Sequence, residues 1–135
     1  MSGAKPRILV YELPGRWTLL AGRSDADNDF LSTEVAEPDD WWFHVDKVPG
    51  GHVVLRARRD EEPGAETLRQ AAAVAAYHSK ARSAGIVPVR YTRARYVTKP
   101  RGAKAGTVGV KGGKVLKVRP DISICLRRGW WRPSD

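Results

Sequence analysis

The sequence predicts an α+β domain built mainly from an antiparallel sheet, with one long and one short helix. Short β-branched and aromatic runs alternate with Pro-Gly and Gly-Gly turns, which is typical of hairpins. One alanine-rich segment has the length and flanking signals of a helix. The chain has 135 residues, 41% of them hydrophobic, which suits one core without disulfide support. We expect a single domain with its helices packed on one face of the sheet.

The first half of the chain is expected to place a short helix between two strand pairs. Pro14-Gly15 and Pro49-Gly50-Gly51 indicate the two hairpin turns. Apolar residues at helical spacing indicate the helix, and Ser24 or Asp25 precedes them as an N-cap. The expected ranges are 8–11 and 17–20 for the first strand pair, 25–36 for the helix, and 41–45 and 52–57 for the second strand pair.

The second half is expected to start with the long helix, over 65–84. Pro63-Gly64 precede this segment and Gly85 follows it as a C-cap. Its alanines leave a slim surface that is able to lie close against a sheet. The strands expected after it are 86–92, 95–97, 107–110 and 115–118.

Charge is distributed unevenly along the chain, whose net charge is +9. Residues 1–46 carry four bases, Lys5 among them, and nine acids, whereas residues 67–120 carry thirteen bases and no acid. An evenly solvated surface would intersperse the two signs. A run of one sign inside a folded domain repels itself, so its presence indicates an external polyanion. Nucleic acid is the predicted partner, with an anionic membrane surface as the alternative that charge alone leaves open.

Cysteine content and apolar runs indicate a cytoplasmic protein. Cys125 is the single cysteine, so no intrachain disulfide and no multi-cysteine zinc site is possible. No segment has the length of a signal peptide core or a membrane span. Neither a Walker loop nor GxGxxG, GxSxG or HExxH occurs in a meaningful context, so we expect no cofactor, no metal and no enzyme motif.

Strand alternation predicts a polar face on the second strand pair. If the odd-numbered apolar residues of 41–45 and 52–57 point into the core, the even-numbered ones share the opposite face. That face would hold Trp42, His44, His52, Val54 and Arg56. Two histidines with Asp29 or Asp46 could bind a metal, and with Arg56 or Lys80 they could cleave a phosphodiester. The preferred hypothesis is a ligand-contacting or structural polar face, because it demands no catalytic geometry.

Further candidate contacts follow the long helix. Lys80 and Arg82 are expected in its last turns, where cations complement the helix dipole. The segment 91–96 interleaves aromatic and basic residues, as stacking on nucleotides requires. Residues 99–106 form a glycine-containing basic loop. The segment 127–132 could pack on the core, stack on a ligand or anchor in a membrane interface, and packing is preferred.

Several motifs, in order, resemble the NFACT-R (NFACT RNA-binding) domain found in ribosome quality control factors such as bacterial RqcH and eukaryotic NEMF-type proteins. They are Gly22-Arg23 with Asn28-Asp29, Trp42-Phe43-His44, Pro49-Gly50-Gly51-His52 and Ser79-Lys80-Ala81-Arg82. The resemblance covers about 17–121 and leaves 122–135 as a basic, aromatic C-terminal segment. Ser24, Glu34 and Gly51 depart from the residues that the family often has.

The resemblance implies an RNA-binding module that contacts tRNA or the large ribosomal subunit. The large family members carry further domains for which this length has no room, so we expect an accessory role in translation. Competing hypotheses are an RNA-cleaving or RNA-modifying enzyme that uses His44 and His52, and an adaptor for DNA or an acidic protein. The candidate nucleic-acid-binding residues are Arg23, Asn28, Asp29, Trp42, His44, His52, Arg56, Lys80, Arg82, Tyr91, Arg93, Lys99, Arg101 and Lys104.

Overall fold

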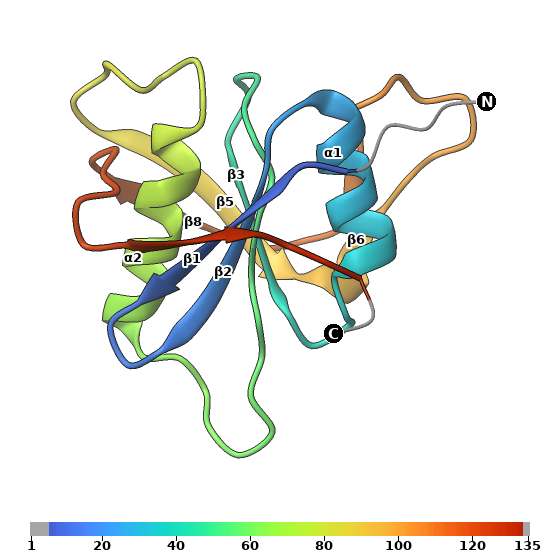
Figure 1. The fold of residues 1–135 in the computed structure, drawn as a ribbon. Helices are drawn as coiled ribbons and strands as arrows, with labels where there is room; N and C mark the ends of the chain where they lie inside the picture. Colours follow the sequence, from blue (N-terminus) through green and yellow to red (C-terminus); the bar gives the residue numbers. More distant parts are fainter. Residues whose placement is uncertain (1–5, 134–135) are drawn as a thin grey trace.

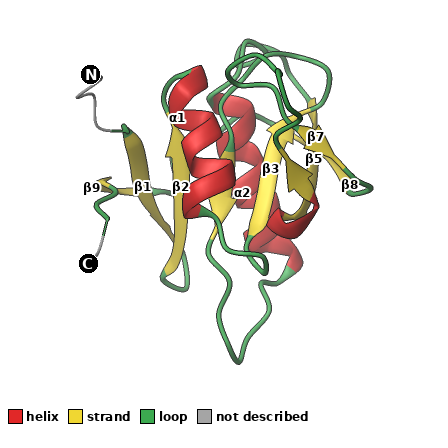
Figure 2. Ribbon diagram, turned by 90° about the vertical axis from the view of Figure 1, so that its right-hand side faces the viewer, coloured by secondary structure: helices red, strands yellow, loops and turns green. Residues whose placement is uncertain are grey.

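A seven-stranded, fully antiparallel sheet forms the centre of the protein, in the order β8-β5-β3-β4-β2-β1-β9 (Figures 1 and 2). The computed structural model describes residues 6–133, so Lys5 and the rest of residues 1–5 and 134–135 lie outside it. The main sheet comprises β1 (Ile8–Leu13), β2 (Trp17–Gly22), β3 (Trp41–Val45), β4 (Val53–Leu55), β5 (Val87–Arg93), β8 (Lys114–Val118) and β9 (Leu126–Trp130). The remaining elements are α1 (Asp25–Phe30), the π-helical turn η1 (Leu31–Val35), α2 (Ala65–Tyr77), the 3-10 turn η2 (Ala94–Tyr96), and a small ribbon of β6 (Val97–Thr98) and β7 (Gly109–Val110). The predicted α+β class is confirmed.

The helices lie on opposite faces of the sheet, so the expectation that they share one face is wrong. Figure 1 shows α2 on one side and α1 on the other, with the sheet between them. The sequence carries two apolar sets on its central strands, one odd-numbered and one even-numbered. Each set needs a cover, because apolar surface left in water destabilises the fold.

The larger core lies under α2. Helix α2 buries four alanines and Val74 against the odd-numbered strand residues Phe43, Val45, Val53 and Leu55. The slim alanine surface brings the helix backbone close to the sheet, as its composition predicts. This half of the fold follows the strand alternation read from the sequence.

The second core lies under α1, η1 and the β6–β7 ribbon. Trp42 and Val54 on the sheet pack there against Leu31, Val35 and Val97. Trp131 joins the edge of this core and meets Phe30 with ring centroids 6.0 Å apart. The C-terminal segment thus packs on the domain, with β9 pairing antiparallel to β1.

Helix α2 ends at Tyr77 and not near residue 84, because the chain turns to bind a neighbouring loop. The amide of Gly51 donates to the His78 carbonyl and the amide of Lys80 donates to the Pro49 carbonyl. Gly50 forms an isolated bridge with Ser79, and a Cβ on Gly50 would lie 2.7 Å from the Ser79 Cβ. Only glycine permits that approach. Lys80 and Arg82 therefore belong to a loop that joins the β3–β4 connection, and not to the last helical turns.

Candidate nucleic-acid interface

His44 and His52 face each other across β3 and β4, as strand alternation predicts. The register pairs Trp42 with Val54 and Phe43 with Val53, and the two imidazole centroids lie 5.2 Å apart at right angles. The face they share is covered by α1 and η1, however. Trp42 is 2% exposed and His52 1% exposed, so neither is accessible for stacking on a base, contrary to the prediction. His44 alone of these three rings is partly exposed.

A buried chain of hydrogen bonds fixes the orientation of His52. The Trp42 indole Nε1–H donates to Ser32 Oγ at 2.9 Å, and Ser32 Oγ lies 2.7 Å from His52 Nδ1. The indole nitrogen is a donor only, so Ser32 Oγ accepts from Trp42 and shares a second hydrogen bond with His52 Nδ1. The serine joins α1–η1 to the sheet through two side chains.

Burial favours the neutral form of both imidazoles. Burial, followed by the neighbouring His44, lowers the pKa of His52 to about 4. Burial also lowers the pKa of His44 below its usual 6.5. A ribonuclease-like pair needs one protonated imidazole as general acid. The lowered pKa values of both rings reduce the protonated fraction that could take this role.

Asn28 and Asp29 position the backbone around the histidines. The buried Asn28 Oδ1 accepts a 3.0 Å hydrogen bond from the His52 amide. A Cβ on Gly22 would lie 2.2 Å from the same Oδ1, so glycine is required there. Asp29 Oδ1 accepts from the Gly106 amide at 3.0 Å, across 77 residues of chain. These two side chains connect the second half of α1 to the residue before β4 and to the basic loop.

Lys99 organises the basic loop from inside. Its Nζ forms a 3.0 Å ion pair with Asp29 and donates to the backbone carbonyls of Lys104 and Thr107. The positive charge of Lys99 is therefore neutralised within the protein by Asp29. Arg101 and Lys104, by contrast, are exposed on the same loop.

Arg56 and Arg93 lie at the other end of the strands, away from the β3–β4 loop. Arg56 binds the Asp40 carboxylate at 2.8 Å and the Val35 carbonyl at 3.0 Å. Arg93 binds the Glu62 carboxylate and stacks over Trp41 at 3.9 Å from the ring centroid. The structure therefore separates both residues from the histidines.

Tyr91 belongs to the α2 face of the sheet. It stacks on Phe43 with centroids 5.7 Å apart and an interplanar angle of 13°. The structure therefore does not bring Tyr91 together with His44.

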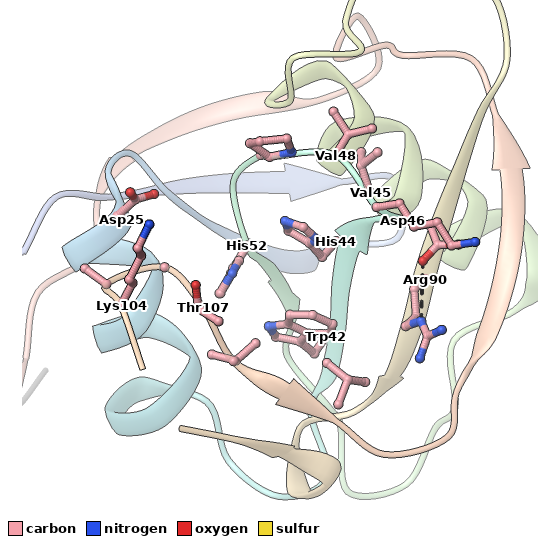
Figure 3. Close-up of a pocket in the computed structure, with 17 residues that line it drawn as sticks. Asp25, Trp42, His44, Val45, Asp46, Val48, His52, Arg90, Lys104 and Thr107 are labelled. Atoms are coloured by element: carbon pink, nitrogen blue, oxygen red, sulfur yellow. Dashed lines mark ion pairs between the residues drawn. The ribbon is translucent and has the colours of Figure 1, made fainter. Parts of the chain in front are cut away.

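The partly exposed His44 lines an open cavity of about 600 Å³ (Figure 3). Lys104 and Asp25 lie on one side of the histidine pair in this view, and the Arg90–Asp46 ion pair lies on the other. Arg90 was not among the predicted site residues. Its register opposite His44 on β5 is the signal that identifies it.

A second cavity, of about 340 Å³, adjoins the first and shares Asp25, Pro49 and Gly50 with it. Arg23, Lys80 and Arg82 line this second cavity and are exposed. They come from the β2–α1 turn and the loop after α2, which lie with the β3–β4 loop at the top of Figure 1. Three separate sequence motifs thus meet at one end of the sheet.

His78 lies inside the second cavity and was not singled out by the sequence. Its Nε2 is 2.9 Å from the Tyr11 hydroxyl oxygen. Burial, and then the positive charges of Arg23, Arg82 and Arg127, lower its pKa to about 4. The charged groups that shift the pKa of His78 are all arginines, although Asp25 also lines this cavity.

Acids from the first half of the chain neutralise part of the acid-free stretch. Of its thirteen bases, four form ion pairs with acids at residues 29–62, and the other nine form none within residues 6–133. The paired bases are Arg90, Arg93, Arg95 and Lys99. Lys80, Arg82, Arg101 and Lys104 stay unpaired. Because these four ion pairs neutralise the paired bases, the positive charge that stays unpaired lies around the two cavities and on the β8 side of the sheet.

Within residues 6–133, no group of three or more His, Cys, Asp or Glu side chains is placed to hold a metal ion. Within the same residues, no helix is long and apolar enough to cross a membrane.

Comparison with known proteins identifies the motif cluster. The model of the NFACT protein RNA binding domain matches residues 8–112, most of the chain. The chain belongs to the NFACT RNA-binding domain family. The matched segment includes the loops that carry Arg23, His44, His52, Lys80 and Arg82, so the resemblance drawn from the motifs is confirmed.

Relatives of known identity agree with this assignment. The chain is 40% identical over 122 residues to the "Rqc2 homolog RqcH" of Bacillus subtilis, covering 90% of this chain and 21% of that protein. It is 39% identical over 106 residues to the protein of the same name from Streptococcus suis, covering 78% and 19%. The chain thus spans about a fifth of the length of these relatives.

A solved structure shows the same fold. It is the C-terminal part of the fibronectin/fibrinogen-binding protein from Streptococcus suis. It superposes with a TM-score of 0.78 at 35% identity, over 90% of this chain and 47% of that one.

Proposed function

We propose that this NFACT RNA-binding domain contacts tRNA or the large ribosomal subunit in ribosome-associated quality control. The observation that carries the proposal is the set of unpaired bases around the two cavities, on loops that hold the family motifs. Phosphate neutralisation by such side chains dominates the affinity of RNA-binding surfaces. The resemblance to RqcH proteins supports the translation setting. The domain binds mainly by backbone electrostatics and shape.

Affinity for tRNA is expected to fall steeply with salt. About five phosphate contacts, from Arg23, Lys80, Arg82, Arg101 and Lys104, give a log–log slope of roughly −4 and a loss of about a thousandfold between about 50 and 300 mM salt. Fluorescence anisotropy with labelled tRNA measures this slope. The double variant Arg23→Ala/Lys80→Ala should reduce its magnitude by about 2.

Arg59→Ala provides the matched control. Arg59 is exposed in the β4–α2 connection, at the end of the sheet remote from the cavities, and should leave the slope unchanged. Affinity independent of salt would overturn the electrostatic mechanism. Competition with DNA and heparin separates RNA binding from a general polyanion adaptor, because the RNA-binding proposal requires tRNA to compete best.

The domain binds RNA without cleaving it, in this proposal. The lowered pKa values of His44 and His52 support that view, because they reduce the protonated fraction that a general acid requires. Labelled tRNA incubated with the wild type should therefore stay intact. Cleavage by the wild type that is absent from a His44→Ala/His52→Ala variant would establish the enzymatic alternative.

A further inference from the structure

The two adjoining cavities are lined by different sets of side chains. The larger one, about 600 Å³, has apolar walls from Val48, Val108 and Val110, the partly exposed His44, and charged side chains that include Asp46, Arg90 and Lys104. The smaller one is lined by the three bases Arg23, Lys80 and Arg82, and Asp25 lines both cavities. The larger volume lies within the range of about 300–1,000 Å³ typical of pockets that enclose a small organic ligand.

His44 offers a fixed, uncharged hydrogen-bonding group to the larger cavity. Its ring packs against Trp42, with centroids 5.9 Å apart and an angle of 19°, and meets His52 at a right angle. Burial lowers the pKa of His44 and outweighs the effect of the Gly50 and Val45 backbone, which lies close enough to favour the protonated ring. A neutral imidazole with one nitrogen donating keeps the other as an acceptor. Every RNA base carries an N–H donor on its pairing edge, so this acceptor suits a base that has left its partner.

The cavity wall opposite His44 is preformed. Gly106 and Thr107 are held by the ion pair of Lys99 with Asp29 and by the Asp29–Gly106 hydrogen bond. A pocket whose walls are already tied in place loses little conformational entropy when a ligand enters. The basic loop therefore serves as a fixed side of the site.

The smaller cavity holds positive charge that the protein leaves without a carboxylate partner. Arg56, Arg90 and Arg93 each pair with an acid, whereas Arg23 and Lys80 form no ion pair within residues 6–133. Arg82 stacks over the Tyr77 ring at 4.0 Å and donates one N–H to the Tyr77 carbonyl. Its remaining donors and the other two cations suit a phosphate group.

We propose that the two cavities together bind one unpaired nucleotide of an RNA strand, with the base beside His44 and the phosphate among Arg23, Lys80 and Arg82. This inference rests on the proposed RNA-binding function and specifies its ligand. A base inside a duplex is stacked and paired, so it does not reach a cavity. The domain should thus select RNA with a bulged or looped-out nucleotide over an uninterrupted duplex.

Binding to two hairpin RNAs with the same stem tests this, one uninterrupted and one with a single bulged nucleotide. Stacking and enclosure of one base are worth about 1–3 kcal/mol, so the bulged RNA should bind at least about fivefold more tightly. A third hairpin, whose bulge is abasic, keeps the phosphate and should lose that preference.

Two variants locate the effect in the larger cavity. His44→Ala removes the acceptor, and Thr107→Trp fills the cavity from an exposed rim position without altering the core. Both should bind the two hairpins equally. Thr18→Trp is the matched control, because Thr18 is exposed on β2 near the opposite end of the sheet, and it should retain the preference.

The outcomes separate this inference from the proposed function. Equal wild-type affinity for all three hairpins would overturn the nucleotide site and leave RNA binding intact. Failure to bind any hairpin or tRNA would overturn both. If free AMP displaces the RNA completely and the protein shows no preference for the bulged hairpin, the cavities bind free nucleotides. That result would overturn the proposal that their ligand is a nucleotide within an RNA strand.

Discussion

Asp40→Ala is expected to destabilise the protein by about 3–5 kcal/mol, although Asp40 lies outside both cavities. Asp40 is 3% exposed and accepts three hydrogen bonds, from Arg56 Nη1 at 2.8 Å and from the amides of Ala57 and Glu37 at 2.8 and 2.9 Å. Removing the carboxylate leaves a half-buried guanidinium and two amides without their acceptor, each of which costs free energy. Urea unfolding of wild type and variant measures the difference.

Asp40→Asn is the matched control, because it keeps acceptor oxygen while removing the charge. It should cost less than Asp40→Ala. Arg56→Ala completes the comparison: it should lower the free energy of unfolding and leave tRNA affinity unchanged in the folded protein. A fall in affinity without loss of stability would restore Arg56 as an RNA contact.

The sequence predicted best what depends on local periodicity. Odd and even positions on β3 and β4 alternate whatever the rest of the chain does, so the opposition of His44 and His52 followed from spacing alone. The hairpin turn at Pro14-Gly15 and the Ser24 cap, whose Oγ accepts from the Asp27 amide, are equally local. The motif cluster that marks the family combines such local features in a fixed order.

Features set by distant parts of the chain were not predictable. Trp42 and His52 are buried because α1 and η1 cover the face of the sheet on which they lie, and no local sequence pattern predicts that packing. Helix α2 stops early because Ser79 meets Gly50, 29 residues away along the chain. The segment predicted as a strand at 95–97 starts as the 3-10 turn η2, which bonds back to Asp40 and Pro38, and β9 was missed because its pairing partner is the first strand.

The prediction that residues 67–120 carry unpaired positive charge was only partly right, because ion pairs with distant residues also decide which bases stay free. A count along the sequence treats the bases of residues 67–120 as uniformly unpaired, yet antiparallel pairing brings Asp46 to Arg90 and the end of α1 brings Asp29 to Lys99. The bases that form no ion pair within residues 6–133 lie on the loops around the cavities and on the β8 side of the sheet, where no neighbouring strand or helix supplies an acid at ion-pair distance.

Acidification from pH 7 to pH 4 is expected to remove about 3 kcal/mol of stability through His52 alone. Its pKa in the folded protein is about 4, against 6.5 for the ordinary side chain, because burial opposes the charged form. In the window between these two values the unfolded chain binds a proton that the folded protein does not. This contribution is fully present above pH 6.5 and is lost as the pH falls to 4. His78, also with a pKa of about 4, acts in the same direction.

Comparing His52→Gln with the wild type isolates the contribution of His52 together with its coupling to His44, because the carboxylates and His78 titrate alike in both proteins. The variant should be less stable at pH 7, since the hydrogen bond to Ser32 changes. The gap in free energy of unfolding should then narrow by about 3 kcal/mol between pH 7 and pH 4, because only the wild type loses His52-linked stability. A difference in free energy of unfolding that stays constant with pH would mean that His52 takes up its proton in the folded protein as readily as in the unfolded chain. That result would support a general-acid role for His52.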